Sequence, residues 1–167
     1  MLRVPHTILI AISGVIWLSI GIMLLSMGTN FLVGSLLEAN QSQPHPMLHL
    51  FAGISGGLEQ AMIILLALGL GLGLLKGRLI FRKTVDRSVK RILSLPNPTS
   101  IFNIYEKKYY ILLLGMVFLG VLARMTPQDV RGFIDVAIGS ALIQGAVLYF
   151  KQAIAQYFVT ESEATQD

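Results

Sequence analysis

Four long apolar stretches separated by polar segments dominate the chain. They cover about residues 8–28, 54–76, 109–125 and 132–151. A helix needs about 20 predominantly apolar residues, and at least about 17, to cross a hydrocarbon core of ~30 Å, and each stretch is long enough. The pattern therefore predicts an all-α integral membrane protein in which four transmembrane helices form a bundle within one domain, residues 1–167.

The first stretch has a competing interpretation as a cleaved signal peptide, because Arg3 precedes an apolar run. However, the run from Ile8 to Met27 is longer than the usual apolar core of a signal peptide, and no site of the A-x-A type follows it. A retained transmembrane helix is the favoured interpretation.

Small residues recur at helical spacing along the stretches. In water each glycine would cost a helix ~1 kcal/mol relative to alanine. In lipid the backbone has no water to bond, so the helix is enforced, and rows of small residues let a second helix approach closely. Rows spaced by four and by seven residues are both present, and the candidates for helix packing are Gly14, Gly21, Gly28, Gly57, Ala61, Gly69, Gly73, Gly77, Gly139 and Gly145.

Basic residues gather between positions 76 and 108, where nine Lys and Arg face only Asp86 and Glu106. The first loop, in contrast, has no Lys or Arg. The positive-inside rule then predicts that both termini and the 76–108 loop are cytoplasmic, in a bacterial inner membrane. Because the net charge of +4 is concentrated in this loop, it reflects topology and predicts no nucleic-acid partner.

The start of this loop is amphipathic. Phe81, Val85, Val89 and Ile92 form a helical stripe, so the second helix either runs on past the membrane or bends onto its surface. Lying on the surface, the stripe would put cations among anionic headgroups, each contributing ~1 kcal/mol. The candidates for headgroup binding are Arg82, Lys83, Arg87, Lys90 and Arg91.

A second polar set falls mostly toward the opposite ends of the spans. Ionisable groups at membrane depth are costly, so by default they mark a function such as a transport pathway. An ion-pair cluster that holds the helix ends together is the structural alternative, and Glu59 alone would suit the N-terminal dipole of its helix. The set is Glu59, Gln60, Arg124, Asp129, Arg131, Asp135 and Gln144.

Metal and cofactor chemistry have little support. His45 and His49 are four apart, a spacing that can bind a metal, but no third ligand is fixed, so ordinary loop histidines are favoured. The chain has no cysteine, which excludes disulfides and thiolate sites. Neither a nucleophile with its base nor a phosphate-binding loop is present. We expect no metal, no cofactor and no enzymatic activity.

The two predicted hairpins resemble each other. Gly21–Met27 can be laid on Gly120–Thr126, and Ala67–Leu72 on Ala137–Leu142. A duplication would relate two tandem hairpins by a pseudo-twofold axis along the membrane normal. The polar, acidic tail, residues 160–167, is predicted to be disordered.

Two functions remain open from the sequence. The favoured one is a transporter or channel subunit for a small solute or ion, built as a homo-oligomer because four helices enclose little space. The alternative is an interaction or scaffold protein that binds partner transmembrane helices, through the Gly69, Gly73 and Gly77 row, or anionic lipid.

Overall fold

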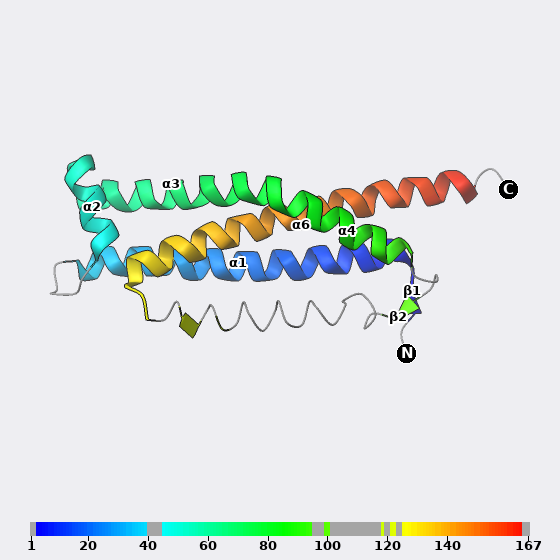
Figure 1. The fold of residues 1–167 in the computed structure, drawn as a ribbon, viewed down its shortest axis with the longest axis horizontal. Helices are drawn as coiled ribbons and strands as arrows, with labels where there is room; N and C mark the ends of the chain where they lie inside the picture. Colours follow the sequence, from blue (N-terminus) through cyan, green and yellow to red (C-terminus); the bar gives the residue numbers. More distant parts are fainter. Residues whose placement is uncertain are drawn as a thin grey trace.

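In the computed structural model the residues that the structure describes are mainly helical, with one short pair of strands (Figure 1). The structure describes residues 3–39, 45–94, 99–100, 118, 121–122 and 125–164. β1 (Arg3–Val4) pairs antiparallel with β2 (Thr99–Ser100), with Arg3 opposite Ser100. The helices are α1 (His6–Glu38), α2 (Pro46–Ser55), α3 (Leu58–Lys76), the π-helical turn η1 (Gly77–Phe81), α4 (Arg82–Leu93) and α6 (Gln128–Ala164).

Within the described residues, three helical segments are long and apolar enough to cross a membrane, and they suggest a membrane protein. They are His6–Glu38, Leu58–Leu79 and Gln128–Phe158. The predicted third span, residues 109–125, lies outside the described residues except for 118, 121–122 and 125. The four-helix bundle and the duplication of hairpins therefore stay predictions.

The described spans differ from their predicted bounds at several ends. α1 continues ten residues past position 28, because Phe31, Leu32 and Val33 extend its apolar sequence. The second span begins at Leu58 and not at 54, since Gly56 adopts a left-handed φ of 84° and ends α2. α6 begins at Gln128 and extends to Ala164, so residues 160–164 are helical where a disordered tail was expected.

An antiparallel glycine seam joins α1 to α6. A methyl group on Gly28 would lie 2.8 Å from the carbonyl oxygen of Gly132, and one on Gly21 would lie 2.9 Å from that of Gly139. Gly14, one heptad further, packs against the ring of Phe150. Glycines spaced by seven stay on one face of a helix in left-handed packing, which is why this row meets a single neighbour.

A second, parallel seam joins α3 to the same helix. Gly73 packs against the carbonyl oxygen of Ala137 and the hydroxyl of Ser140, and Gly77 packs against the backbone of Ala141. One turn further, the ring of Phe81 in η1 covers Gly145. The four-residue spacing of Gly69, Gly73 and Gly77 is the small-xxx-small pattern that allows backbones to touch. Both glycine rows are therefore occupied within the chain.

The two ends of the bundle contain separate hydrophobic cores. One core joins α1, α2, α3 and α6 and contains Leu32, Leu48, Ala61, Leu65 and Val136. The other joins α1, α4 and α6 and contains Leu9, Ile10, Val85, Val89, Ile92, Tyr149 and Ala153. We call these the α2 end and the basic end; α1 begins and α6 finishes at the basic end (Figure 1).

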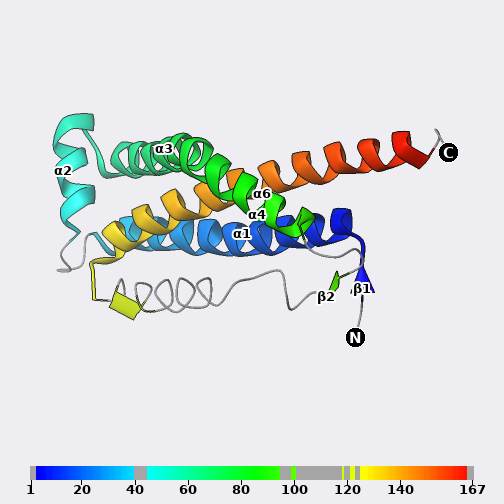
Figure 2. The ribbon, with the colours of Figure 1, turned by 45° about the vertical axis from the view of Figure 1, so that its right-hand side comes forward.

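The apolar stripe of α4 belongs to the second core. Val85, Val89 and Ile92 are buried, and Phe81 meets Trp17 of α1 edge to face with ring centroids 5.3 Å apart. Figures 1 and 2 show that α4 continues from α3 and crosses α6 toward the start of α1. Of the two alternatives for this segment, the structure therefore supports continuation of the second helix, with the apolar stripe packed on α1 and α6 and not free to face lipid.

Candidate functional site

Asp129 ties two helices together at the α2 end. Its side chain is fully buried in the first turn of α6. Carboxylate oxygen Oδ2 accepts hydrogen bonds from the backbone N–H groups of Met47, at 2.7 Å, and Leu48, at 3.0 Å. The other oxygen, Oδ1, accepts from the N–H of Val130 at 2.8 Å. The first N–H groups of a helix lack partners within it and carry a partial positive charge, so one carboxylate stabilises the starts of both α2 and α6.

Arg131 and Asp135 form an ion pair one turn further along α6. Arg131 Nε lies 3.8 Å from Asp135 Oδ2, and the side chains are 21% and 13% exposed. The guanidinium carbon of Arg131 lies 4.2 Å from the ring centroid of Phe31 in α1, a cation–π contact. The structure thus brings together three members of the polar set, Asp129 and this pair, on the first two turns of α6.

This ion pair lies beside an uncharged part of α3. Gly69 packs against Val136 and the carbonyl oxygen of Phe133. Residues 131–135 of α6 therefore lie alongside the middle of the segment Gln60–Leu75, which contains no charged residue. If this part of the bundle lies within a membrane, the mutual contact lowers the cost of the two charges, since isolated charges there are costly.

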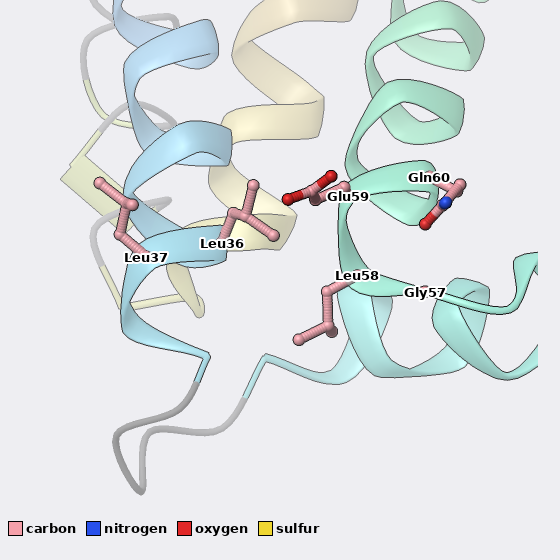
Figure 3. A pocket seen from close by; sticks show the side chains of 6 residues that line it. All are labelled: Leu36, Leu37, Gly57, Leu58, Glu59 and Gln60. Carbon is pink, nitrogen blue, oxygen red and sulfur yellow. The ribbon is translucent and has the colours of Figure 1, made fainter.

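Glu59 and Gln60 lie apart from that pair, in an open groove between the end of α1 and the start of α3. Both side chains are exposed. Leu36, Leu37, Gly57 and Leu58 complete the lining (Figure 3). In Figure 3 the Glu59 carboxylate points toward Leu36, whereas Gln60 points to the other side. A methyl group on Gly57 would collide with the Gln60 side chain and would meet no second helix, so Gly57 is a helix-start position and does not belong to a packing row.

The remaining predicted members do not join this cluster. Gln144 is half-buried, and its Cβ lies 3.1 Å from where a methyl group on Gly77 would be, several turns from Asp135. It packs at the junction of α3 and η1. Arg124 lies outside the described residues.

The exposed side of η1 and α4 is a second candidate site. We define the cationic face as the exposed cations Lys76, Arg78, Arg82, Lys83, Arg87 and Lys90. Asp86 is the acidic residue on this segment, and its Oδ1 accepts a hydrogen bond from Gln152 Nε2 of α6 at 3.2 Å. Arg91 is half-buried. Since the acid is engaged by α6, the charge presented outward by Lys76–Ser94 is positive throughout.

The two histidines do not share an environment. His45 precedes α2 and is only 2% exposed, with no hydrogen-bond partner for either ring nitrogen, whereas His49 is exposed on α2. Within the described part of the chain, no three His, Cys, Asp or Glu side chains are grouped so that they could hold a metal ion.

The sequence did not reveal the role of Asp129. Two local signals were present, namely Asp129 just after Pro127 at a helix start, and Pro46 opening a helix without a capping side chain of its own. The hydrogen bonds from α2 to Asp129 join residues more than 80 positions apart, and no local sequence pattern predicts such a contact.

Taken together, the three long apolar helices of the described residues indicate a helical membrane protein. Comparison with protein-family models, characterised proteins and solved structures finds no match.

Proposed function

We propose that this protein is a membrane interaction protein without transport activity, which holds a rigid cationic face against anionic lipid headgroups at the cytoplasmic side of the membrane. The observation that carries the proposal is the two-sided character of α4. Its apolar side is buried in the bundle, and its other side exposes Arg82, Lys83, Arg87 and Lys90. A rigid helix keeps these cations together, so little conformational entropy is lost when they bind.

The glycine rows favour this function over the one preferred from sequence. The homo-oligomeric channel and the scaffold predicted from the sequence would use those rows for contacts with other subunits or partner helices. Gly21 and Gly73 instead contact α6 so closely that a methyl group does not fit. The bundle is therefore closed along these seams, and the exposed polar surface is left as the place for interaction.

The registers of the helices support a position for the bilayer. α3 is uncharged from Gln60 to Leu75, about 24 Å of helix. α1 is uncharged over about 48 Å, from His6 to Leu37, which exceeds a core of ~30 Å. Only part of α1 can therefore lie in hydrocarbon.

The place of the cationic face indicates which part of α1 can lie in hydrocarbon. On α6, Gly139 contacts Gly21 of α1, and it lies between Ala137 and Ala141, which contact Gly73 and Gly77 of the α3 side. Gly21 is therefore level with the end of α3, and the part of α1 before Gly21 runs beside the basic segment. A bilayer over residues 8–28 would immerse exposed cations at about 2.5–3.5 kcal/mol each. A bilayer from about Leu18 to Glu38 avoids this cost, because it ends near Lys76.

The face then begins at the headgroups and extends away from them. Lys76 and Lys90 are about 21 Å apart along a helix, whereas the headgroup region of one leaflet is only about 5–8 Å thick. We therefore expect the near cations, Lys76, Arg78, Arg82 and Lys83, to bind lipid more strongly than the distal Arg87 and Lys90.

Spin-labelled lipids in reconstituted bilayers test this expectation. The relative affinity of the full chain for phosphatidylglycerol over phosphatidylcholine is measured for wild type, for a variant with the four near cations changed to Gln, and for Arg87→Gln/Lys90→Gln. Wild type should prefer phosphatidylglycerol, and each near cation should account for up to about fivefold of that preference, ~1 kcal/mol.

The distal double variant is the control, since Arg87 and Lys90 are exposed like the near cations and share α4 with Arg82 and Lys83. It should keep most of the preference. Equal affinity of the wild type for both lipids would reject the proposal. An equal loss per cation in the near and distal variants would show that the whole face contacts headgroups and would contradict the expected bilayer position.

Transport by a homo-oligomer is kept as a second candidate because of the ion pair between Arg131 and Asp135. Paired charges beside the uncharged part of α3 suit a proton or ion relay at membrane depth. In proteoliposomes with pH- and cation-sensitive dyes, Asp135→Asn should abolish a wild-type flux without changing assembly size. The groove residue Glu59 is compared through Glu59→Gln. Flux at the wild-type rate in both variants, or no flux in the wild type, removes this candidate.

A further inference from the structure

α2 is too short to cross a membrane and lies across the bundle. Its ten residues, Pro46–Ser55, extend about 15 Å, half of a hydrocarbon core. Figures 1 and 2 agree that α2 runs crosswise to α1 and α3 at the end opposite the cationic face. If the long helices cross the bilayer, α2 therefore runs along the membrane plane.

One side of α2 is firmly attached to the bundle. Leu48 is fully buried in the core that contains Ala61 and Leu65 of α3. The carboxylate of Asp129 holds its first N–H groups. Since Ala61 and Leu65 lie in the first two turns of α3, α2 is level with the outer edge of the apolar segment of that helix.

The other side of α2 is apolar and uncovered. Leu50 is 65% exposed and Ile54 is 80% exposed, one helical turn apart. The segment Pro46–Leu58 contains no charged residue, and His49 supplies the polar group on the exposed side. An exposed Leu and Ile held at the edge of a membrane span are typical of a helix that lies in the bilayer interface.

We propose that α2 is an interfacial helix whose exposed residues Leu50 and Ile54 insert between the headgroups and acyl chains of the leaflet opposite the cationic face. The neighbouring ends of the long helices also expose apolar side chains, since Leu37 at the end of α1 and Ile63 in α3 are 71% and 59% exposed. Through Asp129, the position of α2 in that leaflet is coupled to the start of α6.

The size of the patch favours lipid over a protein partner. Stable protein interfaces bury at least about 1,200 Å². Two side chains supply only a small part of that area. A lipid interface sets no such minimum, because the acyl chains already surround the neighbouring helices.

Single-tryptophan variants test the proposal in the full chain. Trp17 is the one native tryptophan, so Trp17→Phe gives a silent background into which Ile54→Trp or Leu50→Trp is introduced. Both sites are largely exposed, so the larger ring does not have to enter a core. In phosphatidylcholine vesicles, emission should be quenched more by lipid brominated near the headgroup than by lipid brominated near the chain end. Aqueous iodide should quench it weakly.

Lys90→Trp in the same background is the control, because it lies on the exposed cationic face; iodide should quench it and brominated lipid should not. Strong iodide quenching of Ile54→Trp without lipid quenching would overturn the proposal. Protection from both quenchers, with a dependence on protein density in the vesicles, would also overturn it and indicate a second copy of the chain. Ile54→Glu tests the same insertion without an introduced tryptophan. This variant should speed amide hydrogen exchange of Met47–Ser55 in vesicles and leave it unchanged in detergent.

Discussion

Asp129 shows how one buried side chain can organise an end of the bundle. Three backbone N–H groups donate to its carboxylate, which is fully buried. Asp129→Ala leaves these donors without an acceptor, so we expect a loss of about 1–3 kcal/mol in the free energy of unfolding. Differential scanning fluorimetry in detergent should show a melting temperature lower by several degrees, and hydrogen exchange should rise at Met47 and Leu48.

The exposed acid Glu59 provides the control, since Glu59→Ala should change stability by no more than about 0.5 kcal/mol. Asp129→Asn should fall between the two, because an amide keeps one of the two acceptor oxygens. Equal melting temperatures for Asp129→Ala and Glu59→Ala would refute the capping role of Asp129.

For individual residues, the sequence could predict which polar side chains lie near one another along a helix, but not which residues of other helices they contact. Asp129, Arg131 and Asp135 are close in sequence, so their common location at the start of α6 was predictable. Their partners were not, because Met47 and Phe31 lie on α2 and α1, far away along the chain. The burial of His45 likewise depends on where α2 packs.

Among the elements, the spacing of small residues predicted which faces are in close contact. Helix periodicity alone is enough for this, since a row at fours or sevens stays on one side of a helix. It does not say which helix is the neighbour. The rows on α1 and α3 both meet α6, whereas contacts with other subunits or partner helices had been considered from the sequence. The same holds for α4, because an amphipathic stripe can pack against lipid or against other helices, and its spacing does not say which.

Two glycines of α3 give a matched pair for testing the parallel seam. A methyl group on Gly73 would collide with the backbone carbonyl of Ala137, which cannot rotate away, whereas one on Gly71 would meet nothing within 4 Å. Gly73→Ala should therefore destabilise the protein by about 1–3 kcal/mol. Gly71→Ala should be neutral or slightly stabilising, because alanine is the better helix former. Equal melting temperatures for the two variants in detergent would contradict the seam.

For the whole molecule, the apolar stretches alone do not show where the bilayer lies along the helices. The most apolar part of α1 was predicted to be a span at 8–28, and composition alone favours that choice. The exposed cations at Arg82 and Lys83 lie beside this part of the helix only because α3 and α6 run in parallel and α1 packs antiparallel to α6. Such registers are tertiary information, so hydropathy alone could not show that this part of α1 lies beside exposed cations.

Cysteine labelling discriminates between the two positions, and the chain contains no native cysteine to interfere. Ile8 and Val33 are both exposed on α1, at 46% and 40%. They are about 38 Å apart along the helix, so one core of ~30 Å cannot cover both. With the bilayer at about Leu18–Glu38, a membrane-impermeant maleimide should label Ile8→Cys from the side of the basic end and leave Val33→Cys unlabelled until detergent is added. A bilayer at 8–28 requires the reverse, and that result would also remove the reason for expecting near cations to bind lipid better than distal ones.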